Sequence, residues 1–243
     1  MPDQIAADVW RLGDRYVNYY LLRSAGKFVL IDSGLPAHRP QLDVALAAVG
    51  AGIDQLDAVV LTHSHPDHAG TAETVRSRSH ASVHIHGADR QALIGAPYPP
   101  PVKYFLQAWR PFVFGYIRHL MANGITKVPP VVEARAFEDH ETLDIPGRPR
   151  VVHAPGHTPG ACALYFESAG LVFTGDTLVT LNGITGQPGP CLSPAGTDHD
   201  YKQAVASLSA LDGIVAGTVL PGRGEPYRDG LGRALEIVRA KTG

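Results

Sequence analysis

The chain contains the stretch Thr62-His63-Ser64-His65-Pro66-Asp67-His68-Ala69-Gly70, in which four potential metal ligands fall within six residues. The stretch follows the apolar run Ala58-Val59-Val60-Leu61, which is typical of a buried strand. Imidazole nitrogens suit zinc and iron, and a carboxylate suits a harder position beside them. A structural zinc site would favour thiolates, and this stretch has none. We therefore expect a site that keeps coordination positions open for water or substrate.

Three other apolar runs end in polar residues of the same kind. One run leads into Gly156-His157-Thr158, another into Gly175-Asp176, and an early one into Asp32-Ser33-Gly34. Loops that follow strands often carry function, because the sheet holds them rigidly. The spacing therefore predicts that His157, Asp176 and Asp32 join the first histidine stretch in space.

The ordered set of motifs resembles the metallo-β-lactamase superfamily, and the resemblance extends from Asp32 to Gly224. It implies a mixed α/β fold, a four-layer αββα sandwich with a helical insertion. It also implies that the metal ligands are His63, His65, Asp67, His68, His157 and Asp176. Asp32 is expected to orient a metal-bound group through hydrogen bonds, or to be a turn residue, and His153 to support the ligand loop.

The expected ligands divide into two groups. His63, His65 and His157 would form a three-nitrogen site with an open position, where a bound water can ionise near neutral pH. Asp67, His68 and Asp176 would face a second cation. The expected cofactor is Zn²⁺, as one or two ions, with Fe or Mn as alternatives.

One position departs from the family pattern. The superfamily usually has Pro-Gly-His-Gly after a late strand, whereas this chain has Pro221-Gly222-Arg223-Gly224. A guanidinium is always charged and has no lone pair for a cation, so Arg223 cannot be a ligand. We expect it to pair with Asp176, Asp67 or an anionic substrate group, and we assign catalytic roles to Asp67 and Arg223. The alternative is that Arg223 points away and supports the loop.

Other polar residues allow weaker interpretations. Asp198 and Asp200 precede an expected helix at 201–211, and capping of that helix is the favoured role. His199 is an alternative metal ligand that could compensate for the missing histidine.

Composition limits the function further. The 243 residues carry 21 Lys and Arg against 23 Asp and Glu, for a net charge of −2, which gives no basic field for nucleic acid. Cys162 and Cys191 suggest free thiols rather than a disulfide framework. The first residues, from Met1 to Gln4, show no signal-peptide pattern, and no apolar run approaches the roughly 20 residues of a membrane span. A cytoplasmic protein with a small-molecule substrate is expected.

Residues 1–243 are expected to form one domain, with a helical insertion at about 95–130. Apolar residues recur there at spacings of three and four, and Pro111 should kink or split the helix. An aromatic flap over the cleft would suit an apolar or acyl substrate, and its expected contacts are Phe105, Trp109, Phe112 and Tyr116. A homodimer interface and simple core packing are the alternatives, and a membrane-surface helix is less favoured because few basic residues are present.

The leading functional prediction is a metal-dependent hydrolase of an ester, lactone, thioester or amide, which uses a metal-activated water. One alternative is a mononuclear iron sulfur dioxygenase, similar to persulfide dioxygenases, with one histidine of the first motif, His157 and Asp176 as ligands. Another is a metal-binding or ligand-binding protein without turnover, which the arginine at position 223 motivates.

Overall fold

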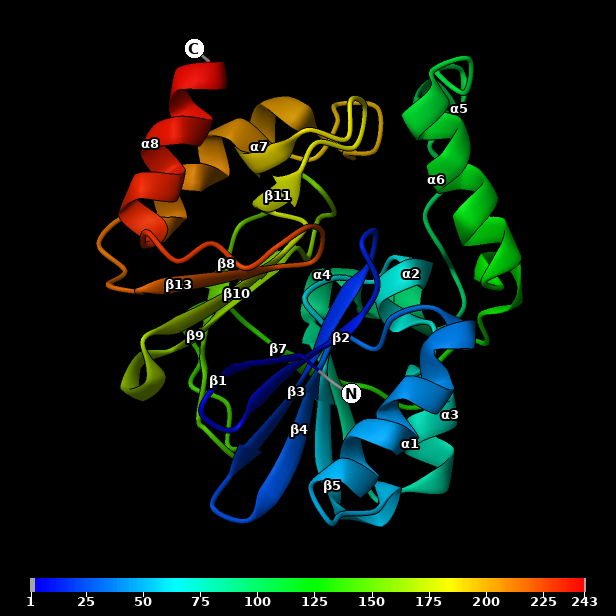
Figure 1. Cartoon of the computed structure of the whole chain (residues 1–243), viewed down its shortest axis with the longest axis vertical. Coiled ribbons are helices and arrows are strands. Elements are labelled where there is room, and N and C mark those ends of the chain that lie inside the picture. Colours follow the sequence, from blue (N-terminus) through cyan, green and yellow to red (C-terminus); the bar gives the residue numbers. More distant parts are fainter. Residues whose placement is uncertain (1–2, 243) are drawn as a thin grey trace.

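The fold consists of two facing β-sheets with helices on both outer sides, as the computed structural model of residues 3–242 shows (Figure 1). The first sheet has seven strands in chain order: β1 (Asp3–Ala6), β2 (Val9–Gly13), β3 (Asn18–Ser24), β4 (Lys27–Ile31), β5 (Leu56–Val60), β6 (Ser82–His86) and β7 (Arg135–Phe137). Strands β1 to β4 pair antiparallel, and β4 to β7 pair parallel.

The second sheet has the order β13-β10-β9-β8, and only its β10–β13 pair is parallel. Its strands are β8 (Arg150–His153), β9 (Cys162–Phe166), β10 (Leu171–Gly175) and β13 (Thr218–Pro221). A separate hairpin joins β11 (Val179–Leu181) to β12 (Pro188–Cys191).

Helices cover the outer faces of both sheets. The first sheet carries α1 (Arg39–Ala48), α3 (Ala72–Arg78) and α4 (Gly87–Ile94), with the short α2 (Pro66–Ala69) at its edge. The second sheet carries α7 (Tyr201–Ser207) and α8 (Leu231–Thr242). The insertion forms α5 (Val102–Phe105) and α6 (Pro111–Ala122), which stand at the periphery on the right of Figure 1.

The central strands are apolar on both faces because each face packs against a different layer. In β4, Val29 and Ile31 point between the sheets, where they join Phe173 and Leu220 of the second sheet. Leu30, one residue out of phase, joins the cluster beneath α1 and α3. A third cluster lies between the second sheet and α8. The expected αββα arrangement is therefore confirmed.

The insertion is split into two helices, which is one of the two outcomes expected of Pro111. Pro111 is the first residue of α6, where its missing N–H leaves no helical hydrogen bond unmade, and α5 has already ended at Phe105. Strands β1, β11 and β12 and helix α4 were not anticipated. In β12 the sequence Pro-Gly-Pro-Cys hides the strand pattern.

Met1, Pro2 and Gly243 lie outside the described residues, so the structure does not test the signal-peptide prediction at the first positions. Within residues 3–242, none of the helices combines the length and the hydropathy that crossing a membrane requires. Cys162 and Cys191 are buried free thiols, as expected.

Candidate metal centre

The predicted ligands converge where strands of both sheets end. β4 ends before Asp32, β5 before the 62–70 stretch, and β10 at Gly175 before Asp176. The turn between β8 and β9 carries His157. The parallel pairs β4–β5 and β10–β13 bring their carboxyl ends to the same edge, so residues from four loops meet there.

Three imidazoles form the first group. Nitrogen atoms of His63, His65 and His157 all lie within 4.8 Å of one another. His65 Nδ1 and His157 Nε2 are 2.9 Å apart, and the His63 ring centroid lies 4.9 Å from that of His65. Burial, and then the neighbouring rings, lower the pKa of His63 well below its usual range and that of His65 to about 3. The rings of His63 and His65 are therefore neutral at physiological pH, as metal ligands must be.

Hydrogen bonds on the far side of the rings fix which nitrogen carries the proton. The Thr62 hydroxyl lies 2.9 Å from Asp32 Oδ2 and 3.0 Å from His63 Nδ1. Because the hydroxyl donates to the carboxylate, its oxygen accepts from Nδ1–H and leaves the lone pair of His63 on Nε2. Asp198 Oδ1 lies 2.7 Å from His157 Nδ1 and fixes that ring in the same way.

Some acceptor atoms of the site receive no hydrogen bond from the described residues. His63 Nε2 is buried and has no hydrogen-bond partner among residues 3–242, and the same holds for Asp176 Oδ1. Between His65 Nδ1 and His157 Nε2, a shared proton or a cation is required. Buried acceptors without partners are costly, so this donor set fits a divalent metal ion.

The second group contains Asp67, His68 and Asp176, but Arg223 lies among them. Arg223 Nε donates to Asp176 Oδ2, and Arg223 Nη2 donates to Asp67 Oδ2; both donor–acceptor distances are 2.7 Å. Nη2 is also 3.5 Å from His68 Nε2, and Nη1 donates to the hydroxyl of Tyr116. The expected pairing of Arg223 with Asp176 and Asp67 is present in the structure, and the outward orientation is not.

The charges of this group compensate one another. Burial disfavours ionisation, yet Arg223 and then His68 hold the pKa of both carboxyls, Asp67 and Asp176, below the usual range. Burial likewise opposes the charge on His68, but Asp176 and Asp32 raise its pKa to about 10. In this arrangement His68 is an imidazolium that donates to Asp32 and faces Asp176.

The approach of β13 to the centre depends on a glycine. A Cβ atom on Gly222 would lie 2.6 Å from both Asp176 Oδ1 and His68 Cε1. Only glycine fits there, and the next residue, Arg223, can then place its guanidinium between the carboxylates.

Asp89, on α4, is a site residue that the sequence analysis missed. It is fully buried, and its carboxylate accepts four hydrogen bonds of 2.7–2.8 Å. The donors are the N–H groups of Ser64 and Gly160 and the hydroxyls of Thr158 and Tyr98. Asp89 therefore ties the loop of His63 and His65 to the loop of His157. In the sequence no motif or recognisable element marks this residue.

Replacing Asp89 with alanine should lower both stability and metal retention. The substitution leaves buried donors from both ligand loops without an acceptor, which costs about 3 kcal/mol, or roughly 6–12 °C in Tm. Thermal unfolding and elemental analysis after dialysis measure the two effects. Asp144→Ala is the matched control, since that side chain is 99% exposed. Equal Tm and metal content in the two variants would contradict the tie between the loops.

The remaining predicted residues lie in different places. Asp200, not Asp198, caps α7 by accepting from Gln203 N–H. His199 donates its backbone N–H to the His157 carbonyl, and its side chain lines a cavity beside His65. His153 contacts none of the three expected ligand histidines. Its ring stacks on His86, and its Nε2 lies 2.8 Å from the Pro159 carbonyl. It can steady the ligand loop only through that carbonyl.

The four aromatic residues that were expected to contact substrate lie in two different environments. Tyr116 is buried and its hydroxyl donates to Asp67, and Phe112 lines a narrow cavity with Tyr116 and Arg223. Phe105 and Trp109 are 42% and 75% exposed and line neither cavity beside the centre. Their placement does not support the prediction that they contact substrate.

A third group, Asp14, His38 and His119, has the spacing of metal ligands, but its side chains connect two elements through hydrogen bonds. His38 Nδ1 accepts from Leu35 N–H, so its Nε2 carries the proton and donates to Asp14 over 2.9 Å. A protonated nitrogen offers no lone pair to a cation. The group instead fastens α6, through His119, to the β2–β3 loop.

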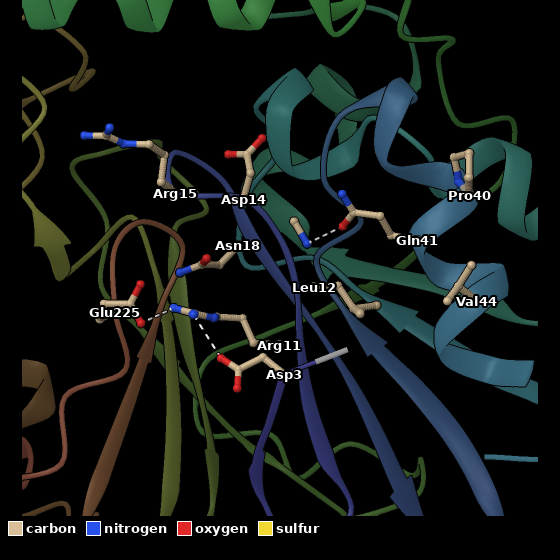
Figure 2. A pocket seen from close by; sticks show the side chains of 11 residues that line it. Asp3, Arg11, Leu12, Asp14, Arg15, Asn18, Pro40, Gln41, Val44 and Glu225 are labelled. Atoms are coloured by element: carbon tan, nitrogen blue, oxygen red, sulfur yellow. Dashed lines mark hydrogen bonds and ion pairs between the residues drawn. The ribbon is translucent and has the colours of Figure 1, made fainter. Parts of the chain in front are cut away.

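One cavity lies away from the imidazoles. It measures about 530 Å³, and Figure 2 shows Arg11 on its wall, paired with both Asp3 and Glu225. A cavity of about 320 Å³ instead opens directly on His65 and His157, between the proline-rich segment at 98–101 and the loop at 195–199. This smaller cavity is the one positioned to bring a ligand to the metal ligands.

Two facing sheets with helices on both sides, and imidazoles and carboxylates gathered at one edge, define a metallohydrolase class of fold and site. The family model of the metallo-beta-lactamase superfamily matches residues 12–223, and the chain belongs to that superfamily.

Individual relatives are distant. The probable metallo-hydrolase YflN of Bacillus subtilis is 25% identical over 92% of this chain and 86% of its own length. The acyl-coenzyme A thioesterase MBLAC2 of Gallus gallus is 28% identical over 66% of this chain and 57% of its own length. The metallo-beta-lactamase family protein TTHA1429 of Thermus thermophilus has a TM-score of 0.70 and 26% identity, covering 98% of this chain and 80% of its own.

Proposed function

We propose that this protein is a metal-dependent hydrolase that holds one tightly bound divalent cation, most simply zinc, on His63, His65 and His157. The observation that carries the proposal is the pair of neighbouring sites with opposite character. His63 Nε2 is buried without a hydrogen-bond partner among the described residues, and His65 and His157 face each other at 2.9 Å, whereas the adjacent carboxylates, Asp67 and Asp176, are both already paired with Arg223.

A cation at the imidazoles would supply a Lewis acid and lower the pKa of water, which is the usual source of a hydrolytic nucleophile in such sites. The chain itself supplies orientation and charge. Asp32, acting through Thr62, and Asp198 hold the imidazole rings in one tautomer. Asp176 Oδ2 lies 3.4 Å from His157 Nε2 and 2.7 Å from Arg223 Nε, and thus joins the imidazoles to the guanidinium.

In this proposal Arg223 and Asp67 are the catalytic residues beside the cation. A guanidinium fixed in a buried site favours negative charge that develops on a reacting acyl oxygen, because it needs no reorganisation when that charge appears. Asp67 and the Tyr116 hydroxyl hold the guanidinium in position. The second cation of a two-metal centre would therefore be replaced, in its electrostatic role, by a side chain.

The substrate we propose is a thioester, with simple esters and lactones as weaker substrates. The 320 Å³ cavity at His65 and His157 has the volume of a small-molecule site. Prolines and Val102 supply apolar wall for an acyl group, while Lys103 and His199 supply polar and cationic groups for an anionic carrier. The thioesterase activity in the name of the Gallus gallus relative supports the same choice.

Metal analysis and a substrate panel test the proposal together. Protein purified without added metal should contain about one zinc or manganese per chain and should hydrolyse acyl-CoA thioesters. Chelation should abolish turnover, and the same metal should restore it. Iron with oxygen consumption on a sulfur substrate would favour the dioxygenase alternative. Full metal content without turnover on thioesters, esters, lactones or amides would favour a binding protein.

Lys103→Gln should weaken binding of an anionic thioester without slowing the chemical step. Removing one partly solvated cation from the cavity wall should raise KM about three- to tenfold and leave kcat within about twofold. Steady-state kinetics on acyl-CoA and on an uncharged thioester separate the effects, since only the first should respond. Lys202→Gln removes an exposed charge elsewhere and serves as control. An equal loss on both substrates would contradict a charge-binding role.

A further inference from the structure

The outer side of the insertion is an unusually apolar surface. Five large apolar side chains on α5, α6 and the turn between them are 42–75% exposed: Phe105, Leu106, Trp109, Phe114 and Met121. Together with Arg118 and Lys127 we call them the insertion surface. A monomeric protein rarely exposes so many large apolar side chains together without a binding role.

Helical spacing places part of this surface on one side of α6, where Phe114, Arg118 and Met121 recur at intervals of four and three residues. Leu106 and Trp109 lie in the turn that leads from α5 to α6. The opposite side of α6 carries Val113 and Tyr116, which pack inward with Tyr104. Figure 1 shows α5 and α6 at the edge of the molecule, with one side directed away from both sheets.

The charged residues of the insertion are all basic. From Gly95 to Val132 the chain has four basic residues and no acidic residue, although acidic residues exceed basic ones in the whole chain. Lys103, Arg118 and Lys127 are exposed, and the Arg110 guanidinium lies over the Trp109 ring at 4.7 Å. None of these four basic side chains forms an ion pair within residues 3–242.

We propose that the insertion surface docks on an anionic lipid surface, with Trp109 and Leu106 entering the interface and the basic side chains contacting headgroups. The few basic residues disfavoured this role in the sequence alone, but the structure leaves them without ion pairs among the described residues, beside exposed Trp, Phe and Leu. Such apolar residues flanked by Lys and Arg are the composition of helices that lie in a bilayer interface. The proposal is independent of the proposed hydrolase function.

A second copy of the chain is a poorer occupant. A two-fold dimer would bring the insertion surface against itself, so that the basic groups of one copy would face those of the other with no acidic residue of the segment to compensate. An anionic bilayer offers the opposite charge instead. Because Val102 and Lys103 also line the cavity at His65, docking would bring that cavity close to the lipid.

Trp109 provides a direct readout. The chain has two tryptophans, and the other, Trp10, is only 6% exposed in the core beneath α1. The metal-loaded protein is titrated with phosphatidylcholine vesicles that contain 0 or about 30% phosphatidylglycerol, and binding is followed by co-sedimentation and tryptophan emission. We expect binding and a blue shift with the anionic vesicles, and a marked loss of both when salt is raised to about 0.5 M.

Matched variants separate the two components of binding. Leu106→Gln with Trp109→Gln, followed by co-sedimentation, should weaken partitioning more than tenfold, whereas Val215→Gln, at a residue 82% exposed elsewhere, should not. Arg118→Gln with Lys127→Gln should weaken it about 10–30-fold, against little change for Arg78→Gln with Lys202→Gln. Basal activity should be unchanged in all variants.

Three results would overturn the proposal. The first is failure of the wild type to bind anionic vesicles. The second is binding that neither variant pair weakens more than its control. The third is a stable dimer by analytical ultracentrifugation that the Leu106 and Trp109 substitutions convert to monomer while vesicle binding is absent, which would identify the surface as a self-association interface.

Discussion

His157→Ala is expected to remove the metal and abolish turnover together. His157 is the expected ligand that the second sheet contributes to the group, and its Nε2 lies 2.9 Å from His65 Nδ1. Loss of one of three neutral ligands should weaken metal affinity more than about 100-fold, since even changes to supporting residues cost 10–100-fold. Elemental analysis after dialysis against dilute chelator, with activity measured on the same sample, checks both results.

The matched control is His153→Ala. His153 lies four residues before His157, but its ring stacks on His86 and contacts none of the expected ligands. It should therefore retain about one metal per chain. If His157→Ala keeps full metal content and full activity, the imidazole group is not the tight site. If His153→Ala loses metal equally, the effect arises from the loop and not from the ligand.

The fold could be predicted well because the decisive signals are local. An apolar run followed by polar residues marks a strand that ends at the functional edge, and this pattern correctly indicated β4, β5 and β10. Most of their residues are apolar because both faces of these strands are covered. Glycine and proline obscured β12, and a short helix such as α4 has too few turns for periodicity to reveal it.

The supporting residues of the metal centre could not be predicted in the same way. Asp89 holds the loop of His63 and His65 through Ser64, which is 25 positions away, and Asp198 contacts His157, which is 41 positions away. Only the packing of α4 and the 195–200 loop brings these residues together. The sequence offered a local role for Asp198, as a helix cap, and no pattern singled out Asp89. A local explanation was sufficient for Asp200 but hid the function of Asp198.

The insertion also shows that local spacing does not predict where a side chain points in the folded protein. Its helical spacing correctly indicated amphipathic helices, but it could not indicate which residues face the cleft. The split at Pro111 turns Tyr116 toward Asp67 and leaves Trp109 on the outer surface. The direction of a side chain depends on how α6 is fastened to the β2–β3 loop through Asp14, which no periodicity encodes.

Arg223→His should raise the number of tightly held metal ions from one toward two per chain. In the unmutated protein the guanidinium satisfies Asp67 and Asp176 at 2.7 Å and lies 3.5 Å from His68, so a cation at this position would meet a like charge. The substitution removes that charge, adds an imidazole ligand and leaves two buried carboxylates in need of a positive partner. Elemental analysis under dilute metal measures the stoichiometry.

Arg223→Gln distinguishes the two contributions, because it removes the charge without adding a ligand. It should keep about one metal per chain and lower kcat on the thioester about 10–1,000-fold, if the guanidinium stabilises the developing charge. Arg223→His should recover part of that loss only when the second ion is bound, so activity should rise with added metal in this variant alone. Two tightly held ions in the unmutated protein would defeat the interpretation of Arg223 as a replacement for the second cation. Because its side chain lines the cavity beside His65, His199 would then be the first candidate for the additional ligand, and loss of one ion in His199→Ala would identify it.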